Sequence, residues 1–285
     1  MKDFVVITPA RNEEENLDGL MKSLESQIIL PDNLIWIIVV NECSDNTLNT
    51  ANDLDPKFKK IVLEYNSSGS LLSGGDFEAF SCGTKFADEH FSPSHFMKLD
   101  ADVRLSVDYF LNMKSIYEKK SGVFGGVNLT VGDRGQRDPN LVRGCDSCYS
   151  REAWKYLEEL PRALGFDVLD KIALRLENFS TEVVHTATFR VIRKTGSSEG
   201  IYRGLVRNGR VCRWTGYSKP YFILRLLRKS LKSPYLFSAI LIFYGYIRAP
   251  KSPFPKNLMR EHANYQNLKL MALVKNPKKW LSENY

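Results

Sequence analysis

The sequence predicts an α/β fold: an open, mostly parallel sheet with helices on both faces, followed by a basic, apolar C-terminal helical extension. Three observations predict it. Short apolar, β-branched runs alternate with segments of helical spacing through most of the first 200 residues. Three of those runs end in clusters of polar side chains. From about residue 200 the chain becomes basic and rich in Leu, Ile, Phe and Tyr.

The first apolar run, FVVIT at residues 4–8, predicts a buried parallel strand because it is β-branched and continuously apolar. Residues 16–27 predict a helix, since apolar side chains recur there at helical spacing: Leu17, Leu20, Met21 and Leu24. The same patterns give the remaining elements. Strands are expected at residues 34–40, 60–65, 95–99, 122–131 and 183–192, and helices at residues 47–54, 76–89 and 107–119.

Polar clusters follow the first, second and fourth strands: ARNE at residues 10–13, NECSDNT at 41–47 and DAD at 100–102. In open α/β sheets, ligands bind outside the carboxyl ends of the strands. We therefore expect the three clusters to meet at one crevice. An Asp-x-Asp pair suits a hard divalent cation such as Mg²⁺ or Mn²⁺. The alternative is a turn or a helix cap, and the acidic residues of ARNEEEN could equally mark the start of a helix.

The net charge of +7 hides an asymmetry. Residues 201–285 hold 17 lysines and arginines against two glutamates, a net of +15, while residues 1–200 hold 23 basic and 31 acidic residues, a net of −8. The basic end predicts an anionic partner: a nucleic acid, a membrane surface or a phosphorylated substrate. The five cysteines are odd in number and scattered, and MKDFVVITPARNEEEN shows no signal peptide, so a cytoplasmic location is expected.

The segment PYLFSAILIFYGYI at residues 234–247 is apolar, carries three tyrosines and has basic segments on both sides. It is shorter than the ~20 residues that span a bilayer. This composition predicts an element at residues 221–250 that lies on an anionic membrane surface, and a buried helix with a basic exposed face is the alternative. A nucleic-acid role is not expected, because the basic residues alternate with aliphatic ones rather than with stacking platforms.

Three segments together carry a family resemblance: VVITPARNEEENLDGLMKSLESQ, WIIVVNECSDNT and FMKLDADVRL. In order and spacing they resemble the family 2 glycosyltransferases, which have the Rossmann-like GT-A fold. The resemblance implies transfer of a sugar from a nucleotide-diphosphate donor to a hydroxyl group, by single displacement with inversion. It also implies a Mn²⁺ or Mg²⁺ cofactor.

The resemblance places residues in two groups. The first group lines the nucleotide pocket: Pro9, Ala10, Arg11 and Glu13. Asn41 stands where the family usually has an acidic residue that binds the base, and Glu42 is the alternative for that role. Asp100 would approach the ribose and the metal, and Asp102 would bind the metal that bridges the diphosphate. Many relatives add a metal-binding histidine at a place that falls here on Ile192 or Arg193.

The stretch GFDVLD at residues 165–170 resembles the family's catalytic-base region, which implies Asp167 as the base and Asp170 as a second candidate. A carboxylate there could take the proton of the acceptor hydroxyl, whereas a helix cap is the structural alternative. The resemblance also implies that the basic segment after the last strand contacts the diphosphate or a phosphorylated acceptor. Its arginines are Arg203, Arg207 and Arg210. Asp146, in a lone C-x-x-C that is poor evidence for zinc, is a candidate acceptor contact or part of a turn.

We therefore expect a catalytic domain at residues 1–200, with a nucleotide-sugar half at about 1–105 and an acceptor half at about 106–200, and a helical tail at 201–285. The expected function is an inverting glycosyltransferase on the inner face of the cell membrane, acting on a lipid-linked or cell-surface glycan. Two other functions stay open. A sugar nucleotidyltransferase would usually have a glycine-rich loop after the first strand, and ARNEEEN has no glycine. A non-catalytic sugar-nucleotide-binding protein would fit Asn41 and the replaced histidine.

Overall fold

The computed structural model describes residues 3–31, 33–66, 75–130, 141–192, 201–231, 233 and 235–276. The chain forms two compact units. Unit 1 comprises Met1–Arg162 and Leu174–Ile192, and unit 2 comprises Ala163–Ala173 and Arg193–Tyr285. The expected boundary at residue 200 differs from this division, because residues 163–173 group with the C-terminal helices.

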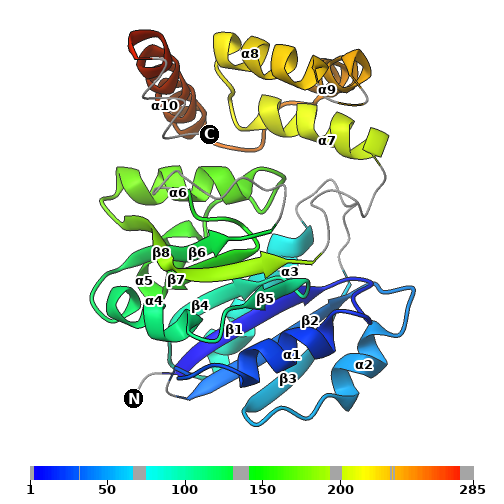
Figure 1. Cartoon of the computed structure of the whole chain (residues 1–285), viewed down its shortest axis with the longest axis vertical. Coiled ribbons are helices and arrows are strands. Elements are labelled where there is room, and N and C mark those ends of the chain that lie inside the picture. The colour runs from blue at the N-terminus through cyan, green and yellow to red at the C-terminus, as the bar shows by residue number, and fades with distance from the viewer. Residues whose placement is uncertain are drawn as a thin grey trace. The chain divides into compact units, whose positions relative to one another are not determined.

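Unit 1 is built on a mixed sheet of eight strands in the order β3-β2-β1-β4-β7-β6-β8-β5 (Figure 1). Strands β1 to β4 are parallel neighbours, as are β6 and β8, whereas β7 and β5 pair antiparallel with theirs. The predicted α/β class with a mostly parallel sheet is confirmed. The strand bounds are Asp3–Ala10, Leu34–Asn41, Lys59–Tyr65, Pro93–Leu99, Val103–Leu105, Gly122–Asn128, Asp146–Ser150 and Ser180–Val191 for β1 to β8.

Helices cover both faces of this sheet because its central strands are apolar on both sides. Alternate residues of β1, such as Val6, join a core with helices α1, α2 and α4. On the other face, α3 approaches β1 so closely that a Cβ at Gly83 would lie 2.6 Å from a methyl group of Ile7. The bounds are Leu17–Glu25, Thr47–Asp53, Gly75–His90, Tyr109–Tyr117 and Arg151–Leu157 for α1 to α5.

The strand β7 was not predicted. Its five residues read DSCYS, which lacks an apolar run, and the sequence suggested a turn there. All five are nonetheless buried, because β7 lies between β4 and β6 and satisfies its backbone by pairing with both. Tertiary position, rather than local propensity, makes this segment a strand.

Unit 2 is helical, as the sequence predicted for this region. Its helices are α6 (Phe166–Leu176, of which the part up to Ala173 belongs to unit 2), α7 (Ile201–Trp214), α8 (Lys219–Ser230), α9 (Leu236–Arg248) and α10 (Lys256–Lys275). A small core of Cys212, Phe222 and Ile242 joins α7, α8 and α9. Among the described residues, no helix combines the length and apolar character needed to span a membrane.

Helices α7 and α9 cross at two glycines. A Cβ at Gly209 would lie 1.9 Å from the carbonyl oxygen of Ile242, and one at Gly245 would lie 2.0 Å from that of Val206. Both distances are far inside van der Waals contact with backbone atoms, which cannot turn aside as a side chain can. Glycine at these two positions therefore sets how closely the helices approach.

Gly245→Ala should destabilise unit 2 by about 1–3 kcal/mol or more, because the added methyl group forces the two helices apart. Denaturant unfolding followed by circular dichroism measures this change. Gly75→Ala is the matched control, since a Cβ there would make only an ordinary contact of 3.7 Å. Equal stability of the two variants would contradict the proposed role of the crossing.

Candidate functional site

The loops that follow β1 and β2 are tied together by hydrogen bonds. The backbone N–H of Ser44 donates to Oδ1 of Asn12 at 2.8 Å, and that of Glu13 donates to the Thr47 hydroxyl at 2.8 Å. Asp45 accepts from the N–H groups of Glu14 and Thr47. The clusters ARNE and NECSDNT therefore form one surface, as the parallel pairing of β1 and β2 predicts.

Two residues of this surface have left-handed backbone conformations. Asn12 has φ of 55° and Glu42 has φ of 42°. Asparagine tolerates this region because its short polar side chain bonds locally, and here it binds Ser44. Glutamate gains no such relief, so the turn after β2 is strained at Glu42, whose side chain is exposed.

The residues predicted for the nucleotide pocket lie around these loops. Pro9, Arg11 and Glu13 are half-buried, whereas Ala10 is buried in the core. Asn41 ends β2 and is only 5% exposed. Its amide nitrogen lies near the first residue of α3, since a Cβ at Gly75 would be 3.7 Å from it. The carboxyl end of β2 and the N-terminus of α3 thus border the same region.

An ion pair between a buried lysine and a half-buried aspartate lies at the carboxyl end of β4. Lys98 is 1% exposed, and its ammonium group pairs with Oδ1 of Asp100. The same ammonium lies 5.1 Å from the centre of the Phe77 ring of α3. Burial would lower the pKa of Lys98, but Asp100 and Asp76 outweigh it and raise that pKa. Lys98 therefore stays charged and fixes the Asp100 carboxylate.

The DAD segment is a tight turn between β4 and β5. The N–H of Val103 donates to the Asp100 carbonyl at 3.0 Å, and the N–H of Asp100 donates to the Cys145 carbonyl at 3.1 Å. Asp102 is half-buried, and its carbonyl accepts the N–H of Ile192 at 2.9 Å. Burial raises the pKa of Asp100, with Asp76 and Asp102 adding to the rise and Lys98 opposing it.

Arg104 fastens this turn to the start of α1. Its guanidinium donates to the carbonyls of Ala101 and Val103 at 2.9 and 2.8 Å, and to the carbonyl of Asn16 at 3.0 Å. The space for this guanidinium exists because residue 19 is glycine: a Cβ there would lie 2.3 Å from the guanidinium. The third polar cluster is therefore connected to the segment that follows the first.

The sequence pointed to neither Lys98 nor Arg104. A signal for Lys98 exists in hindsight: a lysine inside the apolar strand HFMKL must have a partner if the strand is buried. Arg104 gives no such signal, because its acceptors are backbone carbonyls that lie up to 88 positions away in sequence.

The carboxylates of the DAD turn fit Mg²⁺ or Mn²⁺ if substrate phosphates supply further ligands. These ions often take one or two carboxylates and fill the other positions with water and substrate phosphates. Asp100 and Asp102 offer two carboxylates on one turn. The described residues contain no group of three or more His, Cys, Asp or Glu side chains that could hold an ion alone. The residues thus suit a metal that arrives with a diphosphate.

The expected place of a third ligand does lie beside this turn. Ile192 donates its N–H to the Asp102 carbonyl, but its aliphatic side chain, 62% exposed, cannot bind a metal. Arg193 lies outside the described residues. His185 is exposed on β8.

Asp146 lies inside unit 1 with 0% exposure. Its carboxylate accepts the Tyr109 hydroxyl at 2.6 and 2.8 Å and the N–H of Gly126 at 2.7 Å. Burial raises the pKa of Asp146 to about 6, and these hydrogen bonds limit the rise. The acceptor contact suggested for Asp146 stays a prediction, and this burial argues against it.

Asp167 and Asp170 lie on α6, in unit 2. Asp167 is half-buried in the first turn. The preceding Gly165 has φ of 91°, and a Cβ there would lie 2.4 Å from a methyl group of Thr215. The glycine therefore lets the start of α6 pack against the end of α7.

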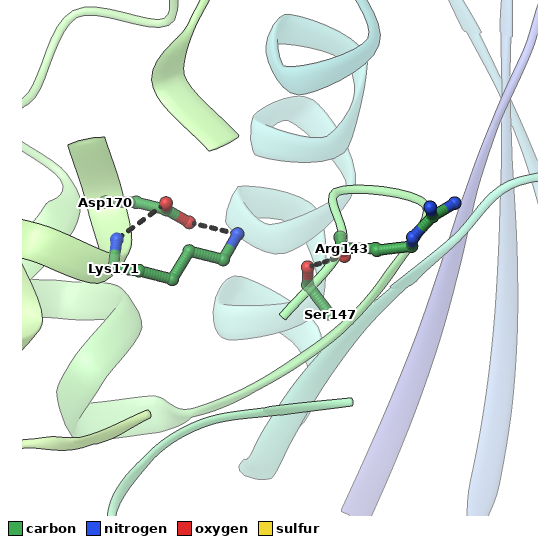
Figure 2. Close-up of polar contacts among 4 residues, drawn as sticks. All are labelled: Arg143, Ser147, Asp170 and Lys171. Carbon is green, nitrogen blue, oxygen red and sulfur yellow. Dashed lines mark hydrogen bonds and ion pairs between the residues drawn. The ribbon is translucent and has the colours of Figure 1, made fainter. Parts of the chain in front are cut away.

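Asp170 is fully buried and accepts from the Lys171 backbone N–H at 2.6 Å and from the Lys171 ammonium at 2.9 Å (Figure 2). Burial and this ion pair keep the Asp170 carboxylate away from the surface of the protein. The geometry therefore favours Asp167 over Asp170 for any role at the surface.

Figure 2 also shows Arg143 and Ser147 of unit 1, where the Ser147 hydroxyl donates to the Arg143 carbonyl at 2.5 Å and closes the turn before β7.

Arg203, Arg207 and Arg210 share one face of α7 in unit 2. Arg203 is exposed, and the other two are half-buried. The guanidinium of Arg210 lies 5.9 Å from the centre of the Trp214 ring. Their contact with a diphosphate or a phosphorylated acceptor stays a prediction.

The family model described as glycosyl transferase family 2 matches residues 5–173 of this chain. That range covers all three polar clusters and ends within α6. A search of curated protein sequences found no match.

Several solved structures share the fold. S. aureus TarS, residues 1–349, is 14% identical with a TM-score of 0.53, and the match covers 97% of this chain and 92% of that one. The complex of the same fragment with UDP-GlcNAc gives 14% identity, a TM-score of 0.52 and coverage of 99% and 79%. A mannosyltransferase from Pyrobaculum calidifontis, solved with GDP-Man and Mn²⁺, is 14% identical with a TM-score of 0.55. That match covers 98% of this chain and 90% of the mannosyltransferase. The chain covers only 44% of the longer TarS structure.

Asp146→Asn should change how stability depends on pH. The folded-state pKa of about 6 lies above the usual 3.8, so ionising Asp146 costs folding free energy. In the wild type, protonated Asp146 adds to the free energy of unfolding below pH ~4, and this stabilisation is lost as the pH rises to ~6. Relative to wild type, the variant should gain about 2–3 kcal/mol between these pH values. Unfolding titrations at several pH values measure the difference, and parallel profiles would contradict the assignment.

Ile192→His should create a third side-chain ligand beside Asp102. With a nucleoside diphosphate present, Mn²⁺ should bind about tenfold more tightly, since a neutral imidazole would add a ligand to the two carboxylates. Calorimetric titration measures the affinity. Ile192→Asn, which changes the same exposed side chain to a weaker ligand, is the control. An unchanged Mn²⁺ affinity in the histidine variant would show that position 192 does not face the ion.

Proposed function

The chain belongs to glycosyltransferase family 2, and from this premise we propose that it transfers a sugar, with inversion, from a nucleotide-diphosphate donor to an acceptor hydroxyl. Nucleotide-sugar glycosyl transfer follows from the family and the shared fold. The inversion, the metal and the acceptor are parts of the proposal.

The observation that carries the proposal is the meeting of polar clusters at the carboxyl ends of β1, β2 and β4. Hydrogen bonds tie the first two clusters together, and Arg104 ties the third to the start of α1. This is the edge where open α/β sheets bind ligands. The neighbours solved with UDP-GlcNAc and with GDP-Man support the same choice of ligand class.

We assign the donor to this edge of unit 1. The residues that would line the nucleotide pocket are Pro9, Arg11, Glu13, Asn41 and Glu42, whereas the buried Ala10 would contribute its backbone alone. Asn41 can accept a hydrogen bond from a base through its carbonyl and can also donate one. Asp100, which pairs with Lys98, would approach the ribose.

Asp102, with Asp100, would hold Mn²⁺ or Mg²⁺. When bound, such an ion neutralises charge that develops on a leaving diphosphate. Arg203, Arg207 and Arg210 would add positive charge, because a guanidinium binds phosphate in a bidentate manner.

In the proposed reaction, Asp167 is the base that accepts the proton of the acceptor hydroxyl. The acceptor oxygen forms a bond to the anomeric carbon, and the bond from that carbon to the diphosphate oxygen breaks with its electron pair leaving on the diphosphate. The acceptor's proton passes to the Asp167 carboxylate. A positioned carboxylate base contributes about 10²–10⁴-fold to such a step. Asp170 cannot take this part without giving up its ion pair with Lys171.

The acceptor class we propose is a lipid-linked or cell-surface glycan, and the location is the cytoplasmic side of the membrane. The basic, apolar character of residues 201–285 supports this choice, because it suits a substrate that is held at a membrane surface.

Two variants test the enzyme. Asp167→Asn should lower Mn²⁺-dependent hydrolysis or transfer of UDP- and GDP-sugars by about 10²–10⁴-fold while donor binding is kept. Asp102→Asn should weaken the metal requirement and lower turnover about a hundredfold, since a bound ion supplies several kcal/mol of charge stabilisation. Release of the nucleoside diphosphate measures both.

Asp53→Asn is the matched control, because Asp53 is an exposed carboxylate at the end of α2. A wild type that binds donor and never turns it over would favour the non-catalytic alternative. Full turnover in Asp167→Asn would remove that residue from the mechanism.

A further inference from the structure

Helix α9 carries an apolar arc that no described part of the chain covers. Six large apolar side chains, each between 49% and 67% exposed, lie within about a third of the helix circumference. They are Leu236, Phe237, Ile240, Phe243, Tyr244 and Ile247. A patch of this size is unusual on the surface of a monomeric protein and marks an interaction site.

Helix α8, the neighbour of α9, carries exposed apolar residues of its own. Ile223, Leu224 and Leu227 are 57%, 39% and 60% exposed and share one face of α8. The opposite face of α8 carries Phe222, which is buried and stacks on Tyr246 of α9 at 4.2 Å between ring centres. We call the exposed apolar residues of these two helices the α8–α9 face.

The other side of α9 is already occupied. Ser238, Ile242 and Gly245 are buried on it, and Gly245 contacts the backbone of α7. Figure 1 shows α7 and α8 next to α9 in unit 2. Among the described residues, α9 packs on protein with this side, so a partner that covers its arc would meet it side-on, with the helix axis lying along the partner's surface.

The charge of this region selects the partner. Residues 201–260 contain 13 lysines and arginines and no aspartate or glutamate. Around the α8–α9 face, Lys219, Arg228, Arg248 and Lys251 are exposed. A second copy of the same face would bring like charges together, whereas a surface of anionic phospholipid headgroups would complement them.

We propose that the α8–α9 face docks unit 2 on an anionic bilayer, with α9 lying in the interface and its apolar arc among the acyl chains. Tyrosines suit this position because the ring is apolar and the hydroxyl stays hydrated, and Tyr244 lies on the arc. The proposal names the surface for the membrane location proposed above, and it does not depend on the transfer reaction, since its residues differ from those assigned to the donor and the base.

The test is co-sedimentation of the full chain with vesicles of phosphatidylcholine containing about 30 mol % phosphatidylglycerol, and with vesicles of phosphatidylcholine alone. The wild type should bind the anionic vesicles, and more weakly as salt rises. Combining Phe237→Ser, Ile240→Ser and Ile247→Ser should weaken this binding about tenfold or more, because three apolar side chains lose their burial in the interface. Circular dichroism checks that the variant keeps its helices.

Two further variants complete the design. Arg228→Glu with Arg248→Glu should weaken binding to anionic vesicles only. Val107→Ser with Leu111→Ser, which removes two side chains of unit 1 that are 53% and 47% exposed, should leave vesicle binding unchanged.

Wild-type binding that is absent, or equal on both kinds of vesicle, would overturn the proposal. So would unchanged vesicle binding by the triple variant, or a dimer in sedimentation equilibrium that the triple variant abolishes. Donor hydrolysis measured without vesicles separates this outcome from failure of the proposed function. A docking failure with normal hydrolysis would reject the surface and leave the enzyme standing.

Discussion

The Lys98–Asp100 ion pair is the constraint on which the site depends. It places a charged ammonium with 1% exposure beneath the carboxyl end of β4, against α3, and fixes the carboxylate that opens the DAD turn. Removing Asp100 would leave the buried Lys98 ammonium without this partner, which is strongly destabilising. The fold therefore sets the position of the Asp100 carboxylate before any ligand binds, and preorganised charge of this kind can stabilise charge that develops in a transition state.

The surrounding sheet explains why these groups meet. Parallel pairing of β1 with β2 and β4 brings three chain segments to one edge, and their loops are then joined by side chains rather than by sequence proximity. Asn12 binds the second loop, and Arg104 joins the third to α1. Unit 2 supplies a carboxylate at Asp167 and a basic, apolar helical surface. In our proposal the donor residues belong to unit 1, whereas the candidate base and the docking surface belong to unit 2.

Periodicity predicted the parallel half of the fold because its central strands, β1 and β2, are apolar on both faces and each cluster directly follows a strand. It failed for β7, whose DSCYS is buried by its neighbours and not by its own composition. It also missed Lys98 and Arg104, since their partners are set by tertiary contacts. Asp146 shows the same limit: it stands in a turn-like sequence, yet its carboxylate is fully buried and accepts the Tyr109 hydroxyl. Sequence patterns identify where polar groups gather, and packing decides which of them face a ligand.

The central claim is that the three clusters bind a nucleotide-diphospho-sugar together with a metal ion. Thermal unfolding of the full chain with UDP-, GDP- and dTDP-sugars, each with and without Mn²⁺, tests it most directly, because a ligand that binds only the folded state raises the melting temperature. The account predicts that one nucleotide sugar with Mn²⁺ raises it more than the sugar nucleotide or Mn²⁺ alone. No shift with any of the three donors in the presence of Mn²⁺ would contradict the account.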